Sequence, residues 1–102
     1  MATLTTEQAR AKLAGLPGWE LSDNAIRRTF TFEDFTAAVS YVVRLGFAAE
    51  AADHHPDIDV RYKRVTLTYS THSEGGLTEK DFAGAETATK LAGQPASPKP
   101  KA

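Results

Sequence analysis

Apolar side chains recur along this chain with two periods, one typical of helices and the other of strands. The helical period of three to four residues runs through three segments, at about 5–13, 34–54 and 79–92. Alternation of apolar and polar residues, typical of half-buried strands, runs through four shorter segments between them. The order helix, two strands, helix, two strands, helix, with short connections, predicts an α+β fold. We expect a two-layer sandwich, in which a four-stranded antiparallel sheet carries three helices on one face.

Capping signals mark the ends of the predicted helices. Thr5 and Gln8 have the spacing of a capping box, in which two side chains satisfy free amides at a helix start. Thr78 and Asp81 repeat this spacing before the last helix, and Gly93 ends that helix. For Asp81 we favour this structural role over a functional one, because holding a helix start is reason enough for the residue.

The central helix is apolar on two flanks. The flank expected to face the sheet consists of Phe35, Ala38, Val39, Val42, Gly46, Ala49 and Ala52. Tyr41, Leu45 and Ala48 form a second, partly apolar flank that one sheet would leave uncovered. We therefore expect a partner helix or an oligomer contact on this second flank.

The four predicted strands form two hairpins. The first joins strands at 19–21 and 25–32 through a turn at 22–24. The second turns at Lys63-Arg64. Its core-facing residues are expected to be Ile58, Val60 and Tyr62 on one strand and Val65, Leu67 and Tyr69 on the other.

Length and composition are those of one small folded domain, and they exclude several classes of function. The 102 residues are 41% apolar and 25% charged, enough for a single core without disulfides or metals. Twelve basic and 13 acidic residues give a net charge of -1 without a basic cluster, so nucleic acid is not an expected partner. The absence of cysteine removes disulfides, thiolate metal sites and thiol nucleophiles.

The two ends of the chain predict no further domain. Segment 93–102 is rich in proline and has no apolar anchor, so we expect a domain over 1–92 followed by a disordered tail. The start of the chain has no basic segment leading into an apolar run, and no segment approaches the roughly 20 apolar residues of a membrane span. We expect a cytoplasmic protein without a membrane partner.

The three histidines are the strongest chemical signal in the chain. His54 and His55 end the central helix, and His72 follows the last strand, so all three fall within residues 54–72. Pro56 disfavours helical backbone at the residue before it, so the rings of His54 and His55 should point in different directions. The antiparallel hairpin that begins after Pro56 should bring His72 back toward them. We expect the three imidazoles to converge on one pocket.

Such a set of histidines is suited to acid–base chemistry. Because histidine titrates near neutrality, the set can supply both a proton donor and a proton acceptor, as elimination of water from a carbon requires. Glu50, four residues before His54, could orient an imidazole or bind an amino-heterocycle, and Asp53 is a second candidate. A zinc site is the alternative reading, but zinc-binding histidines on one helix are usually spaced by about three to five residues. We therefore expect neither a metal nor a cofactor.

A spaced set of residues resembles the signature of the pterin-4a-carbinolamine dehydratases. The set is Glu50, His54-His55-Pro56, Tyr62, His72 and Asp81. The likeness covers roughly residues 4–92, through Gly18-Trp19, Phe30-Thr31-Phe32, Ser70-Thr71-His72 and 76–81. A lone His-His-Pro would carry little information, whereas the full spacing is specific.

The resemblance implies an activity and a set of site residues. The activity is dehydration of 4a-hydroxytetrahydrobiopterin to quinonoid dihydrobiopterin, which recycles the pterin cofactor of aromatic amino acid hydroxylases. Acid–base roles are implied for His54, His55 and His72, and substrate-binding roles for Glu50, Asp53, Ser70 and Thr71. The family's dimers and tetramers imply a homo-oligomer.

An alternative is a non-catalytic relative that binds or assembles another protein, such as a chaperone of a carbon-fixing enzyme. Relatives of that kind tend to lose the histidines, whereas all three are present here. Some animal members also act as dimerisation cofactors of homeodomain transcription factors. The loop Ser73-Glu74-Gly75 lacks the cysteine that those animal proteins carry, so we do not expect this second role.

Overall fold

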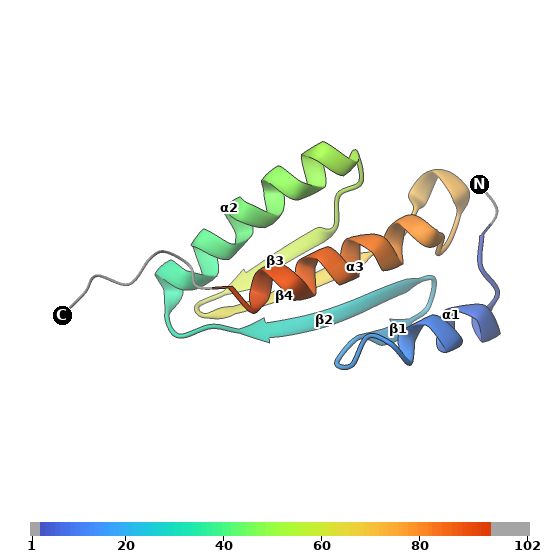
Figure 1. The fold of residues 1–102 in the computed structure, drawn as a ribbon, viewed down its shortest axis with the longest axis horizontal. Helices are drawn as coiled ribbons and strands as arrows, with labels where there is room; N and C mark the ends of the chain where they lie inside the picture. Colours follow the sequence, from blue (N-terminus) through green and yellow to red (C-terminus); the bar gives the residue numbers. More distant parts are fainter. Residues whose placement is uncertain (1–2, 95–102) are drawn as a thin grey trace.

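A computed structural model describes residues 3–94 and shows the two layers of an α+β sandwich (Figure 1). Its elements are α1 (Thr6–Leu13), β1 (Glu20–Ser22), β2 (Ala25–Thr31), α2 (Phe35–Ala52), β3 (Asp57–Arg61), β4 (Arg64–Tyr69), the 3-10 turn η1 (His72–Glu74) and α3 (Glu79–Ala92). The four strands are antiparallel in the order β1-β2-β4-β3. The predicted fold class is confirmed, while most of the expected tail, 95–102, lies outside the described residues.

Both predicted capping boxes are present. The Thr5 hydroxyl accepts the Gln8 amide at 3.1 Å, and the Gln8 side chain accepts the Thr5 amide at 2.9 Å. At the start of α3 the backbone amide of Thr78 donates to the carboxylate of Asp81 at 2.9 Å. Helix α2 begins after Asp34, whose carboxylate accepts an amide of the first turn at 2.8 Å. Local side-chain chemistry therefore sets the start of each helix.

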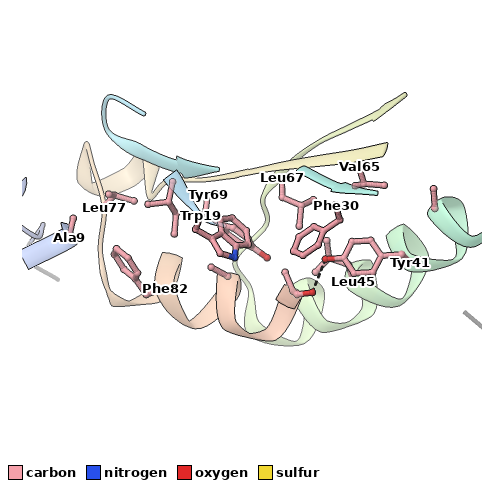
Figure 2. Close-up of a cluster of buried hydrophobic side chains, with 14 residues drawn as sticks. Ala9, Trp19, Phe30, Tyr41, Leu45, Val65, Leu67, Tyr69, Leu77 and Phe82 are labelled. Carbon is pink, nitrogen blue, oxygen red and sulfur yellow. Dashed lines mark hydrogen bonds between the residues drawn. The ribbon is translucent and has the colours of Figure 1, made fainter. Parts of the chain in front are cut away.

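The core lies between the sheet and helices α2 and α3 (Figure 2). Its largest fully buried apolar residues are Ile26, Tyr41, Leu45, Val65, Leu67 and Tyr69. Two buried aromatic residues also bond to α3: the Trp19 indole donates to the Thr89 hydroxyl at 2.9 Å, and the Tyr41 hydroxyl donates to the Ala88 carbonyl at 2.8 Å. These two bonds fix α3 against the start of the sheet and against α2.

Helix α2 buries residues of both predicted flanks: Ala38 and Ala49 of the flank expected to face the sheet, and Tyr41 and Leu45 of the second flank. The partner helix expected on the second flank is α3, to which the Tyr41 hydroxyl donates a hydrogen bond. Phe35 and Val39, which were expected against the sheet, are instead 52% and 40% exposed. Together with Val43 and Phe47 they form an exposed apolar row, which we call the outer stripe of α2.

By length and composition alone, α2 could cross a membrane, contrary to the expectation that no segment approaches such a span. Its 18 residues have a mean hydropathy of 1.2, a value that core helices of soluble proteins also reach. Tyr41 and Leu45 lie in the core, and Arg44 donates to the Leu91 carbonyl of α3 at 3.2 Å. The packing of α2 within the sandwich accounts for its buried apolar residues, whereas the outer stripe stays uncovered.

The second hairpin turns one residue earlier than predicted. Arg61 pairs with Arg64, so the turn consists of Tyr62 and Lys63. Two-residue hairpin loops need left-handed backbone, which Tyr62 supplies with a φ of 53°. Tyr62 is therefore 66% exposed and lies outside the core, contrary to expectation. Ile58 and Val60, which were also expected to face the core, are 39% and 38% exposed on β3. Strand β1 is likewise displaced by one residue from its predicted position.

Candidate functional site

The end of α2 turns two histidines in different directions, as predicted. Asp53 caps the helix with left-handed backbone, at a φ of 52°, and Pro56 then holds the chain in extended form. The imidazole of His54 reaches α3, whereas that of His55 bonds to Glu50 on α2. The two rings therefore have different surroundings.

His54 is held by Asp81, a carboxylate that is fully buried in the first turn of α3. The Nε2 atom of His54 lies 2.6 Å from Oδ1 of Asp81. The other oxygen, Oδ2, accepts the Thr71 hydroxyl at 2.8 Å and the Thr78 amide at 2.9 Å. Because a carboxylate only accepts, Nε2 of His54 carries a proton in this bond, and no described residue pairs with Nδ1. The sequence favoured a capping role for Asp81 and did not reveal its bond to His54.

The hydrogen bonds around Asp81 have a fixed direction. Thr71 is 5% exposed and donates its hydroxyl to Asp81, so the Thr78 hydroxyl must donate to Thr71, at 2.8 Å. Three donors thus point at one carboxylate, from His54, Thr71 and Thr78. Thr71, expected to bind substrate, here supports the carboxylate that orients His54.

His54 lines a groove between α2 and α3 with a volume of about 270 Å³. The groove is lined by Leu45, Ala48, Ala49, Ala52, His54, Tyr69, Lys80, Ala83, Gly84 and Thr87. The His54 ring stacks on that of Tyr69, with 5.9 Å between centroids and 24° between planes. Small apolar side chains around one oriented imidazole make a site suited to a flat organic ring and to proton transfer.

Tyr69 forms the floor of this groove, and its hydroxyl stays protonated. Burial, and next the negative charge of Asp81, raise the pKa of Tyr69 to about 12. Gly84 on α3 lies directly over the ring, since a Cβ atom there would be 2.5 Å from Cε1 of Tyr69. The expectation that Tyr69 packs in the core is confirmed, and the ring also contributes to the groove.

His55 does not line the groove. Its Nε2 atom lies 2.5 Å from Oε1 of Glu50, and the two side chains are 54% and 79% exposed. Glu50 was expected to orient the imidazole of His54. It orients that of His55 instead. Asp53 is exposed at the cap of α2. An exposed pair of this kind contributes little to stability, so its effect is to position the His55 ring.

His72 lies in η1 and is exposed. Together with Ser70 and Thr71 it lines a more polar hollow of about 440 Å³, which shares no lining residue with the groove beside His54. The described chain therefore does not gather the three imidazoles in one cavity, contrary to expectation. Tyr69 turns toward the helices and His54, and after Ser70 the chain leaves the sheet into η1. No three His, Asp or Glu side chains within residues 3–94 form a metal-binding group.

The fold and the site together define a class of protein: a small α+β sandwich with a carboxylate-bound histidine at an apolar groove. The family model described as pterin 4 alpha carbinolamine dehydratase matches residues 2–91 of the chain. The chain belongs to this family.

Similar proteins from several bacteria agree with this assignment. A relative from Mycobacteroides abscessus is 53% identical over 85% of this chain and 93% of its own length, and one from Chloroflexus aurantiacus is 48% identical over 91% and 100%. Both carry the provisional name pterin-4-alpha-carbinolamine dehydratase. A crystal structure of a transcriptional coactivator/pterin dehydratase from Brucella melitensis has a TM-score of 0.86 and 39% identity, covering 89% of this chain and 99% of that one.

A more distant structure shares the fold alone. It is a pterin dehydratase-like protein described as a RuBisCO assembly factor in the alpha-carboxysome. Its TM-score is 0.61 at 21% identity, and the match covers 74% of this chain and 87% of that one. The likeness therefore carries no argument for an assembly function here.

Proposed function

We propose that this protein dehydrates 4a-hydroxytetrahydrobiopterin to quinonoid dihydrobiopterin and water. Membership of the family and the names of the relatives support a pterin carbinolamine dehydratase. The observation that carries the proposal is His54, bound through Nε2 to the buried Asp81 and lining the groove between α2 and α3. In the reaction the C4a–O bond breaks, the N5–H proton leaves, a C4a–N5 double bond forms and water departs.

In this proposal His54 is the base. Its Nδ1 atom takes the N5 proton of the substrate, and the imidazolium that results is stabilised by Asp81. The leaving hydroxyl needs a proton, which we assign to His55 or His72. Both are exposed in the free chain, so either ring can reorient toward a bound ligand. Glu50, Asp53 and Ser70 are proposed to contact substrate around this site.

A stopped-flow assay with chemically generated carbinolamine tests the proposed activity. The purified protein is expected to accelerate dehydration in proportion to its concentration. A variant with His54, His55 and His72 replaced by Ala supplies the background, because it has no imidazole; circular dichroism is used to check that it is folded. Equal rates for the two proteins would contradict the proposal.

We also propose that the chain assembles into a homodimer or homotetramer. Support comes from the outer stripe of α2, in which Val43 is 54% and Phe47 is 76% exposed. Ile58 and Val60 add further apolar surface on the edge strand β3, at 39% and 38% exposed. Contiguous apolar patches of this kind are typical of protein–protein contacts.

Val43→Asp is expected to lower the molar mass in solution to that of the monomer, because it places a charge in the middle of the outer stripe. Light scattering coupled to size exclusion measures the mass. Ala11→Asp, at an exposed position of α1, is the control and should leave the mass unchanged. A monomeric wild-type protein would rule out the assembly.

A further inference from the structure

Tyr69 differs from the other buried aromatic residues in the bonding of its polar atom. Trp19 donates to Thr89, and Tyr41 donates to the Ala88 carbonyl. The hydroxyl of Tyr69 bonds to no residue of the described chain, although Tyr69 is only 1% exposed. Figure 2 shows its ring between the sheet and the helices. Among residues 3–94 the fully buried side-chain atom without a partner is Nε of Arg44, so the Tyr69 oxygen is not closed off by the fold. Because Tyr69 lines the groove, its hydroxyl is open to a hydrogen-bond partner that the described chain does not provide.

The position of Tyr69 connects this hydroxyl with the candidate site. The residue lines the groove between α2 and α3, and its ring stacks on that of His54. Glycine at position 84 makes room for the ring, since a Cβ there would lie 2.5 Å from Cε1 and 2.8 Å from Cζ. Any larger residue at position 84 would therefore clash with the ring.

The chemistry of the groove defines what the hydroxyl can bind. Burial raises the pKa of Tyr69 to about 12, so at neutral pH the hydroxyl remains a donor. Ala48 and Ala83 are among the small apolar residues of the lining, and they suit the faces of a flat ring. A ligand of this groove is therefore expected to be a flat heterocycle with an acceptor atom directed at the floor.

We propose that Tyr69 is a substrate-binding residue, whose hydroxyl donates a hydrogen bond to an acceptor on the substrate ring beside His54. The proposal rests on the proposed function, because it takes the ligand to be a pterin. Pterins present a carbonyl oxygen and ring nitrogens as acceptors. The bond fixes how the ring enters the groove, and hence which of its atoms meets the imidazole.

Tyr69→Phe tests this assignment, because it removes only the hydroxyl. The variant is expected to bind 7,8-dihydrobiopterin about tenfold more weakly by calorimetry, or about 1.4 kcal/mol. KM for the carbinolamine should rise by a similar factor with little change in kcat, as expected when a bond is present in both ground and transition states. The melting temperature should not fall, because no bond within the protein is lost. Tyr41→Phe is the matched control: it loses the bond to Ala88, so it should melt earlier and keep its affinity.

The outcomes separate this inference from the proposed function. If the wild-type protein dehydrates the carbinolamine and Tyr69→Phe has the same affinity and KM, the inference is wrong and the proposed function stands. If the wild-type protein binds the dihydropterin through Tyr69 without accelerating dehydration, the inference stands and the function fails. A melting temperature that falls in Tyr69→Phe while affinity is unchanged would assign the hydroxyl to the fold, and would overturn the inference.

Discussion

Asp81→Asn is expected to slow dehydration about as much as His54→Ala, by roughly 10²-fold or more, as for the loss of an acid–base group. The amide oxygen of asparagine can still accept from Thr78 and Thr71, so the amide nitrogen would face His54. That nitrogen donates, and a neutral imidazole would then have to accept at Nε2 and carry its proton on Nδ1. The base would present a proton to the substrate where a lone pair is needed.

Two measurements separate this effect from a loss of structure. Nitrogen NMR of the His54 ring should show the proton on Nε2 in the wild-type protein and on Nδ1 in Asp81→Asn. The double variant should be no slower than His54→Ala, because residues that act as a unit are not additive. Multiplication of the two rate losses, or an unchanged proton position, would show that Asp81 acts by some other route than His54.

Gly84→Ala is expected to destabilise the fold by about 1 kcal/mol net, measured by urea unfolding. The added Cβ would lie 2.5 Å, 2.8 Å and 3.1 Å from three atoms of the Tyr69 ring, which is buried and cannot move aside. Overpacking of a core typically costs about 1–3 kcal/mol, and here it must also exceed the gain of about 1 kcal/mol from replacing glycine in a helix.

Gly46→Ala provides the matched control for this substitution. Gly46 also lies within a helix, α2, but apart from its two chain neighbours and the surrounding helix backbone no atom of residues 3–94 lies within 4 Å of the position that a Cβ atom would take there. This substitution should therefore stabilise the protein by up to about 1 kcal/mol. Stabilisation by both substitutions would mean that α3 can retreat from Tyr69, and that the close approach of Gly84 is not required by the fold.

Those features of the fold that depend on neighbouring residues could be predicted from the sequence. The capping boxes at Thr5 and Thr78 are examples, because each depends on residues within one turn. The turn of the second hairpin could not be placed in this way. In the observed register Val60 pairs with Val65, whereas the predicted turn would pair Val60 with Leu67. Both registers direct the same side chains toward the helices. Alternation does not distinguish registers that differ by two residues.

Which residues of α2 lie in the core could not be predicted, because both of its flanks are apolar. The contacts that determine the buried residues are long-range, such as the hydrogen bond from Tyr41 to Ala88, 47 residues away. The divergence of His54 and His55 followed from the local effect of Pro56, and it is confirmed. The bond between His54 and Asp81 joins residues 27 positions apart and depends on where α3 lies, so the capping box alone could not reveal it.

Asp81 has two roles, which couple the orientation of the His54 ring to the first turn of α3. The same carboxylate closes the first turn of α3 and holds the imidazole of His54, and Thr78, Asp81 and Phe82 of this turn are buried. Few buried contacts and exposed backbone bonds characterise helix ends that open locally, and this end has neither property. On warming, the proposed activity should therefore persist until the sandwich itself unfolds.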